Sequence, residues 1–175
     1  MLIFNFLFLL IGLDQFCRIQ SMASESIVTT ISSNQFYYDI NSSDRFPALC
    51  RLLDMFLGKR KIIFCRTKRD VDHLTEKLNL LNYSAQGYHG DLSPTNRDKA
   101  LKRFSDFSID TLLVTDIPKD ISGISEIELV VFSMIPQDPD SYIQRVQRLE
   151  SMFSIGEIST LITSSEFKKL AFIKR

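Results

Sequence analysis

Residues 61–81, KIIFCRTKRDVDHLTEKLNLL, contain the pattern that decides the fold. Residues 61–67 are a short apolar run bounded by polar residues, which predicts a buried β-strand. Residues 70–81 then carry valine and leucine at three- and four-residue spacing, which predicts an amphipathic helix. The apolar face of this helix consists of Val71, Leu74, Leu78 and Leu81. A buried strand followed by an amphipathic helix is the unit from which α/β sheets are built.

The same alternation of strand and helix runs outward in both directions from this segment. Because most of the strands are continuous apolar runs and helices separate them, we expect a mainly parallel sheet covered on both faces. The predicted fold class is therefore α/β, with helices on both faces of the sheet. The other strands are predicted over residues 35–40, 84–90, 111–115, 128–135 and 158–163, and the other helices over residues 46–56, 93–107 and 140–152.

Polar residues gather where these strands end, and in parallel α/β sheets ligands bind at the carboxyl ends of the strands. Arg66 lies at the carboxyl end of one predicted strand, whereas Arg97 and Arg145 lie in later helices, and guanidinium groups suit phosphate. The same charge pattern also fits a rim, meaning the edge of the sheet at the carboxyl ends of its strands, that merely faces solvent. Both interpretations therefore stay open at this point. The polar strand ends are residues 65–68, 89–91, 115–116 and 136–138.

The composition limits what such a rim can do. The chain has 175 residues, of which 45% are hydrophobic, and this is enough for one folded domain. Lys and Arg (21) balance Asp and Glu (21), so any surface that binds nucleic acid must be local. Three cysteines and two histidines at wide spacing cannot form a four-ligand zinc site without carboxylates. We interpret the cysteines as core thiols and predict no metal site.

The first 34 residues are predicted to lie outside the domain, which takes up residues 35–175. Residues 1–13, MLIFNFLFLLIGL, are apolar but too short for a membrane span, which needs about 20 residues, and we expect them to pack apart from the domain. They have the length of an export-signal core, yet no Lys or Arg precedes them. Residues 21–34 are rich in Ser and Thr, as in a linker. We expect a cytoplasmic protein without a membrane partner; export through an atypical signal is the alternative.

Two kinds of catalytic loop are missing from the sequence. The phosphate loop G-x-x-x-x-G-K-S/T is absent, because Arg60 follows Gly58 and Lys59, so the chain cannot cradle a triphosphate by itself. A thiol phosphatase is the strongest alternative class of enzyme, since Cys65 lies near the end of a predicted strand and precedes an arginine. Its loop would need a second arginine six positions later, where Val71 stands, so we interpret Cys65 as a packed thiol.

Several groups of residues, in order, resemble the motifs of the C-terminal RecA-like domain of DEAD-box RNA helicases, especially the bacterial cold-shock branch. The resemblance covers residues 35–163 and implies a RecA-like sheet. The matching segments are IIFCRTK at 62–68 for motif IV, QGYHGDLS at 86–93 with Arg97 for the HGD and QxxR motifs, LVTD at 113–116 for the start of motif V, and IPQDPDSYIQRVQR at 135–148 for the approach to motif VI and its first half.

The resemblance implies an RNA-binding role for four residues. The Gly90 backbone and Thr115 would meet RNA phosphates, and Arg97 would contact or brace the same backbone. Arg66 would belong to the contact surface of motif IV. Contacts of this kind address sugar and phosphate and carry no information on base sequence.

On the nucleotide side, Arg148 holds the position of an arginine finger, which in the family stabilises charge on the transferred phosphoryl group. Asp116 and Arg145 would lie at the nucleotide face or between the two helicase lobes. The alternative for both arginines is an exposed helix face on which they pair with Glu150 or Asp140.

Motifs V and VI depart from the family pattern. Asp120 replaces an arginine of motif V, and Gly123 replaces its ribose-binding carboxylate. In motif VI, Ser151 replaces the last arginine finger, and Glu150, in place of a glycine, is expected to bring a carboxylate beside the phosphates. We therefore expect no ATPase activity from this chain alone; ATP and Mg²⁺ would bind only if it paired with a first helicase lobe carrying the phosphate loop. The other changes are Gln144 and Gln147 in motif VI and Pro94 in the QxxR motif.

Three hypotheses remain for the function. The leading one is a lone, degenerate second helicase lobe that binds RNA weakly through the phosphate backbone. The second is a partner that docks on a first lobe of another chain and completes or modulates its ATPase, with Arg148 supplied in trans. The third is a decayed helicase remnant, for which relaxed selection would explain the losses in motifs V and VI together.

Overall fold

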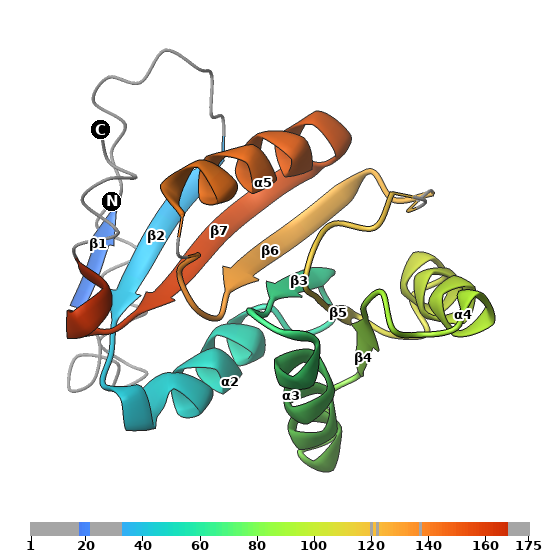
Figure 1. The fold of residues 1–175 in the computed structure, drawn as a ribbon, viewed down its shortest axis with the longest axis horizontal. Coiled ribbons are helices and arrows are strands. Elements are labelled where there is room, and N and C mark those ends of the chain that lie inside the picture. Colours follow the sequence, from blue (N-terminus) through green and yellow to red (C-terminus); the bar gives the residue numbers. More distant parts are fainter. Residues whose placement is uncertain (1–17, 22–32, 120, 122, 137, 168–175) are drawn as a thin grey trace.

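A computed structural model of the chain describes residues 18–21, 33–119, 121, 123–136 and 138–167. Within these residues, seven strands form one sheet in the order β1-β2-β7-β6-β3-β5-β4 (Figure 1). The strands are β1 (Arg18–Ser21), β2 (Asn34–Asp39), β3 (Lys61–Phe64), β4 (Ala85–Tyr88), β5 (Thr111–Val114), β6 (Glu126–Phe132) and β7 (Ser154–Ile162). The α-helices are α2 (Arg45–Met55), α3 (Lys68–Leu80), α4 (Pro94–Ser105) and α5 (Pro139–Met152), and two short 3-10 helices are η2 (Ser42–Asp44) and η3 (Ser164–Glu166).

The sheet is parallel from β2 to β4, and only β1 at the edge pairs in the antiparallel direction. Every residue of β3 and β5 is buried, as expected for inner strands that helices cover on both faces. The predicted α/β fold with a mainly parallel, RecA-like sheet is confirmed.

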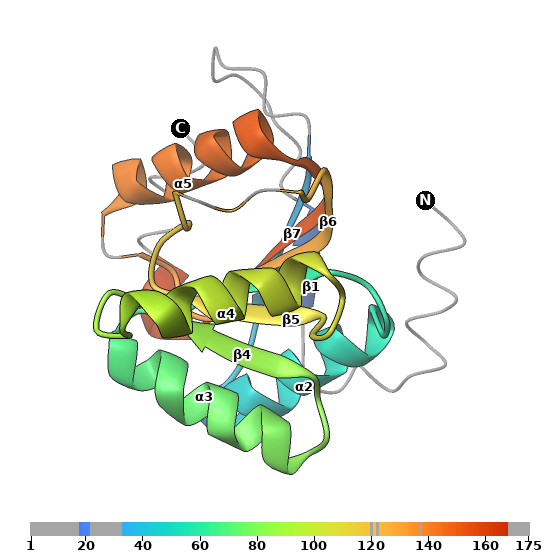
Figure 2. The same cartoon turned by 90° about the vertical axis from the view of Figure 1, so that its right-hand side faces the viewer.

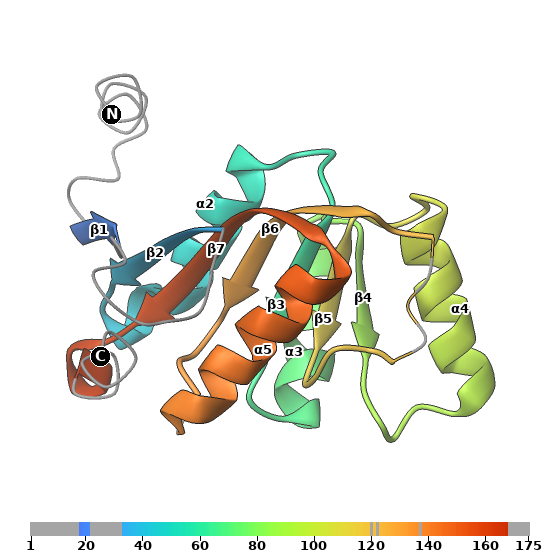
Figure 3. The ribbon, with the colours of Figure 1, turned by 90° about the horizontal axis from the view of Figure 1, so that it is seen from above.

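Two hydrophobic cores lie on the two faces of the sheet. One core joins α4 and α5 to the sheet through side chains such as Phe104, Tyr142 and Val146. The other joins α2 and α3 through side chains such as Leu53 and Leu78. Figure 2 shows α5 on one side of the strands and α2 and α3 on the other, and Figure 3 shows α5 crossing in front of the strands. Helices on both faces are therefore confirmed.

Polar caps place the helix starts next to the strand ends. Thr67 and Asp70 form a capping box at the start of α3: the Thr67 side chain accepts a hydrogen bond from the Asp70 amide, and the Asp70 carboxylate accepts one from the Thr67 amide. The Ser93 side chain caps α4 in the same way by accepting from the Asn96 amide. These caps begin α3 and α4 within a few residues of the ends of β3 and β4, and so hold the intervening loops close to the sheet.

The amino-terminal segment differs in part from the prediction. The sequence predicts that residues 1–34 lie outside the domain, whereas Arg18–Ser21 form β1 and pair with Phe36–Asp39 of β2. Residues 1–13, which we expect to pack apart, lie outside the described residues. No helix in the described part of the chain is long and apolar enough to cross a membrane.

Candidate nucleic-acid interface

The carboxyl ends of three neighbouring strands form the candidate site. Phe64 of β3 pairs in register with Val114 of β5, and Val114 pairs in register with Tyr88 of β4. Adjacent strands are about 4.8 Å apart, so the carboxyl ends of the three strands lie within about 10 Å along the sheet edge. Thr115 comes one residue after these paired strand ends, and Arg66 and Gly90 come two residues after them.

The predicted contact residues are accessible at this edge. Gly90 is exposed, and a Cβ atom added there would meet no heavy atom within 4 Å. Thr115 is half-buried. Arg97 is half-buried in the first turns of α4, and its guanidinium makes no hydrogen bond or ion pair with any of the described residues. An open backbone position and a guanidinium without a partner among the described residues each suit a phosphate oxygen.

Two acid–base pairs tie the loop after β4 to α3. His89 is buried, and its Nε2 lies 3.0 Å from Oδ1 of Asp72. The ammonium group of Lys68 forms an ion pair with the exposed carboxylate of Asp91. The hydrogen bond from Lys68 is the main cause that lowers the pKa of Asp91. Lys68 is paired closely in this way, whereas Arg66 makes only a longer 3.7 Å ion pair with Glu166. Arg66 and Arg97 are therefore the better candidates for contact with phosphate.

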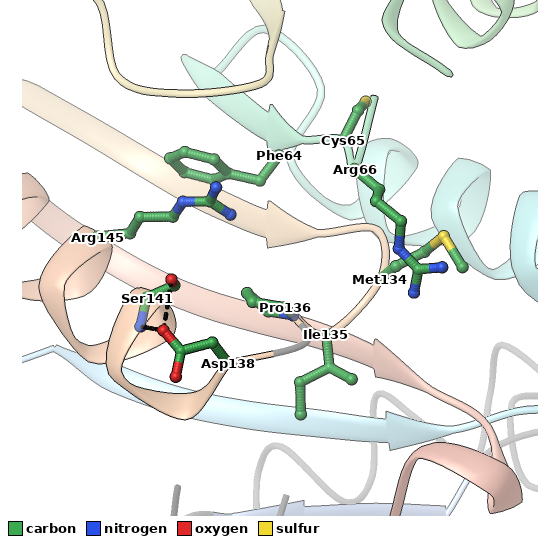
Figure 4. A pocket seen from close by; sticks show the side chains of 9 residues that line it. All are labelled: Phe64, Cys65, Arg66, Met134, Ile135, Pro136, Asp138, Ser141 and Arg145. Atoms are coloured by element: carbon green, nitrogen blue, oxygen red, sulfur yellow. Dashed lines mark hydrogen bonds between the residues drawn. The ribbon is translucent and has the colours of Figure 1, made fainter. Parts of the chain in front are cut away.

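A pocket opens between the ends of β3 and β6 and the start of α5 (Figure 4). The guanidinium of Arg145 lies over the ring of Phe64, with Cζ 5.6 Å from the ring centre. Asp138 caps α5 by accepting hydrogen bonds from the Ser141 amide at 3.0 Å and the Ser141 hydroxyl at 2.8 Å. These hydrogen bonds lower the pKa of Asp138 and place a carboxylate at the helix start. The nine lining residues are Phe64, Cys65, Arg66, Met134, Ile135, Pro136, Asp138, Ser141 and Arg145.

Cys65 borders this pocket as a buried thiol. Burial raises its pKa to about 12, and the hydrogen bond with Ser133 opposes that rise only in part. A nucleophilic cysteine needs a lowered pKa, so the interpretation as a packed thiol is confirmed. Cys50 is only half-buried, and Cys17 lies outside the described residues. Among the described residues, no group of three or more His, Cys, Asp or Glu side chains is placed to hold a metal ion.

Arg148 pairs with neither of the acids considered from the sequence. Its Nη1 lies 3.8 Å from Oδ2 of Asp116, in the loop after β5, and its side chain is 36% exposed. Ser151, at the position of the second arginine finger, donates a hydrogen bond from Oγ to the carbonyl of Arg148 at 2.8 Å. The structure therefore joins the predicted residues Arg148 and Asp116 in one weak ion pair.

Glu150 does not share the surroundings of Arg148. Its Oε1 accepts hydrogen bonds from the Ser33 amide at 2.9 Å and the Ser33 hydroxyl at 2.6 Å. Two residues apart on an α-helix project about 200° apart, so Glu150 and Arg148 lie on opposite sides of α5. The carboxylate near Arg148 comes from Asp116, whereas Asp120 lies outside the described residues.

Two residues beside the rim are missing from the sequence predictions. Glu166 of η3 lies near Arg66, and Arg45 of α2 binds Glu166. The spacing of Thr163 and Glu166, a capping-box pattern, could have indicated the local role of Glu166. No local pattern marks Arg45, whose partners are 88 to 121 residues away in the chain.

Comparisons with known proteins agree with this geometry. A model of the helicase conserved C-terminal domain matches residues 44–151. The chain is 38% identical over 152 residues to the DEAD-box ATP-dependent RNA helicase CshA of Geobacillus kaustophilus, covering 85% of this chain and 32% of the relative. It is 38% identical over 162 residues to CshA of Bacillus subtilis, covering 90% and 32%.

The fold comparison gives the same result. The crystal structure of a DEAD box protein from the hyperthermophile Methanococcus jannaschii aligns with a TM-score of 0.69 and 34% identity, covering 79% of this chain and 38% of that chain. The chain thus spans about a third of the length of the curated relatives it matches. It belongs to the helicase conserved C-terminal domain family, as the C-terminal RecA-like domain of a DEAD-box RNA helicase.

Proposed function

We propose that this domain binds single-stranded RNA through the phosphate backbone, weakly and without preference for sequence. One observation carries the proposal: Arg66, Thr115 and the exposed Gly90 follow the carboxyl ends of three adjacent strands, at the same edge of the sheet. Guanidinium, hydroxyl and backbone amide groups are donors to phosphate and sugar oxygens and carry no base-sequence information. With few such contacts, binding should be weak and sensitive to salt.

Replacing Arg97 with alanine is expected to weaken binding to every RNA sequence alike, by about three- to tenfold, because one phosphate contact is lost. The slope of log affinity against log salt concentration should become shallower by about one unit. The measurement is a titration of two labelled single-stranded RNAs of unrelated sequence with the full chain, at low and moderate salt.

Lys102→Ala is the matched control for this titration, since Lys102 is an exposed cation in the last turn of the same helix. It should leave both affinities nearly unchanged. Nanomolar affinity for only one of the two RNAs would contradict the proposal, as would equal binding by Arg97→Ala and the unaltered chain.

A second candidate function is supply of Arg148 in trans to a first helicase lobe of another chain. The observation that favours it is the long 3.8 Å pair between Arg148 and Asp116, which leaves the guanidinium 36% exposed. Two features oppose it: the carboxylate of Asp116 lies 3.8 Å from the guanidinium that would have to stabilise negative charge, and Ser151 replaces the second finger. We therefore propose that the chain does not hydrolyse ATP alone and remains a binding module, degenerate at its nucleotide face.

Mixing the chain with an isolated first lobe of a related helicase is expected to give no RNA-stimulated ATP hydrolysis above the rate of that lobe alone. The reason is the missing second finger, since a single charge contact in the transition state contributes about 3 to 4 kcal/mol. The measurement is phosphate release with and without RNA. Turnover that appears on mixing and disappears with Arg148→Ala would show that the second function is the right one.

A further inference from the structure

Glu166 places a buried carboxylate against one of the proposed RNA contacts. Its side chain lies in η3, directly after β7, and is 9% exposed. Its Oε2 lies 2.7 Å from Nη2 of Arg45 and accepts hydrogen bonds from the amide and hydroxyl of Thr163, both at 3.0 Å. Its Oε1 points to Arg66, whose Nη2 is 3.7 Å away.

Arg45 fixes the position of this carboxylate. Its Nη1 donates to the carbonyl of Ser133 at 2.6 Å, just after β6, and to the carbonyl of Leu161 at 3.0 Å, at the end of β7. Burial raises the pKa of Glu166, but the hydrogen bonds from Arg45 and Thr163 outweigh this and leave the pKa below its ordinary value. Glu166 is therefore ionised at neutral pH and held by the sheet itself.

Arg66 is held less tightly. The 3.7 Å separation from Glu166 is an ion pair but too long for a hydrogen bond, and the Arg66 side chain is 38% exposed. Figure 4 shows Arg66 extending from the end of β3 along the rim toward Met134. A guanidinium has five N–H donors, so this ion pair leaves most of them available to an incoming phosphate.

We propose that Glu166 is a positioning residue that holds the Arg66 guanidinium at the rim and competes with RNA phosphate for it, so that η3 restrains the affinity of the domain for RNA. This inference rests on the proposed RNA binding. The charges decide the direction of the effect: the Glu166 carboxylate already neutralises part of the charge of the Arg66 guanidinium, so an RNA phosphate must compete with it for that group.

Glu166→Gln is expected to tighten binding of both RNAs by about two- to fivefold, the range that corresponds to a partly exposed ion pair. Gln keeps an oxygen that accepts from Arg45 and Thr163 but has no charge. The salt slope should steepen by up to one unit, because Arg66 then engages a phosphate fully. The gain should vanish when Arg66→Gln is also present, since Glu166 acts only through Arg66.

Glu126→Gln is the control, because Glu126 is an exposed residue that begins β6, at the opposite end of the strands from the rim. It removes the same charge and should change the affinity little. If Glu166→Gln does not fold, as judged by circular dichroism, Glu166→Asp takes its place. That variant keeps a charge for Arg45 but withdraws the carboxylate from Arg66 by one methylene, and a smaller gain of the same sign is expected.

The outcomes separate this inference from the proposed function. If the unaltered chain binds RNA and the Glu166 variant binds equally or more weakly, the inference is overturned while RNA binding stands. A gain that persists with Arg66→Gln also overturns it, because the carboxylate would then act on the RNA directly. If the unaltered chain binds neither RNA, the proposed function fails, and the inference fails with it.

Discussion

Replacing Lys61 with methionine is expected to lower the free energy of unfolding by about 3 kcal/mol. Lys61 begins β3 and is 1% exposed, which is rare for a lysine. Its Nζ donates to the carbonyls of Phe56 at 2.9 Å and Lys59 at 2.7 Å and lies 3.0 Å from Oδ2 of Asp110. The ammonium therefore joins the loop before β3 to the residue before β5. Methionine fills a similar volume but gives these oxygens neither a donor nor a positive charge.

The cost of burying the ammonium works against this loss. Burial lowers the pKa of Lys61, and the hydrogen bond and charge of Asp110 raise it only in part. We expect the loss of these contacts to outweigh the burial cost that the substitution removes, because breaking a buried pair leaves the remaining partners uncompensated. Urea unfolding followed by circular dichroism measures the difference. Lys59→Met is the control, since the Lys59 side chain is 59% exposed and its ion pair with Glu128 is long, at 3.9 Å. This substitution should change stability by less than about 0.5 kcal/mol. A Lys61→Met chain as stable as the unaltered one would show that the burial cost dominates.

Arg45→Met is expected to lower the free energy of unfolding by a similar amount, about 3 to 4 kcal/mol at neutral pH. The side chain of Arg45 is 20% exposed and spans the ends of β6 and β7 through the carbonyls of Ser133 and Leu161. Its removal takes a donor from both carbonyls and the main counter-charge from Glu166. Among the described residues, Glu166 then keeps Thr163 as its close hydrogen-bond partner and remains buried.

The loss should depend on pH. The pKa of Glu166 in the folded chain lies below its ordinary value of 4.5, so its ionised form contributes stability above about pH 4.5. That contribution is lost as the pH falls through the folded-state value. The difference in stability between the unaltered chain and Arg45→Met should therefore shrink as the pH is lowered below about 4.5. Urea unfolding at neutral pH and in the acid range measures it.

Arg69→Met is the matched control, because Arg69 is an exposed arginine in the first turn of α3. It should change stability by less than about 0.5 kcal/mol at either pH. A loss in Arg45→Met that stays constant with pH would show that the two carbonyls, and not Glu166, account for the stabilisation by Arg45.

Hydrophobic periodicity was sufficient to place strands β2 to β7 and helices α2 to α5 to within a few residues. The apolar runs around KIIF and TLLV became β3 and β5, buried along their whole length. The helix predicted over residues 70–81 spans Lys68–Leu80, because the capping box of Thr67 and Asp70 starts it two residues earlier. Local pattern and local structure agree here because each helix and strand buries the face that its own spacing defines.

Strand β1 shows where local pattern was insufficient. Residues 18–21 have no alternation that predicts a strand, and their pairing depends on the free edge of β2. Backbone hydrogen bonds across a sheet are available to almost any side chain, so an edge strand can form without a sequence signal. Cys50 differs from its prediction in another way: from the sequence we interpret it as a core thiol on a predicted helix, but its side chain is only half-buried.

The positions of the proposed contact residues could also be predicted from the sequence, because parallel strands bring their carboxyl ends to one edge. Arg66, Gly90 and Thr115 follow such ends, and the register of β3, β5 and β4 sets them along that edge. The partners of the charged residues could not be predicted from the sequence. Arg148 binds Asp116 and not Glu150, because α5 turns Glu150 to the other side of the helix toward Ser33.

Strand, helix and rim therefore follow from residues close together in the chain, since periodic burial and strand direction need no knowledge of distant segments. The pairing of charges was decided only by the folded sheet. Arg45 is 121 residues from Glu166, and Ser33 is 117 residues from Glu150. The physical reason is that an ion pair depends on distance in space, and the order of the strands brings β2, β7 and β6 side by side although they are far apart in sequence.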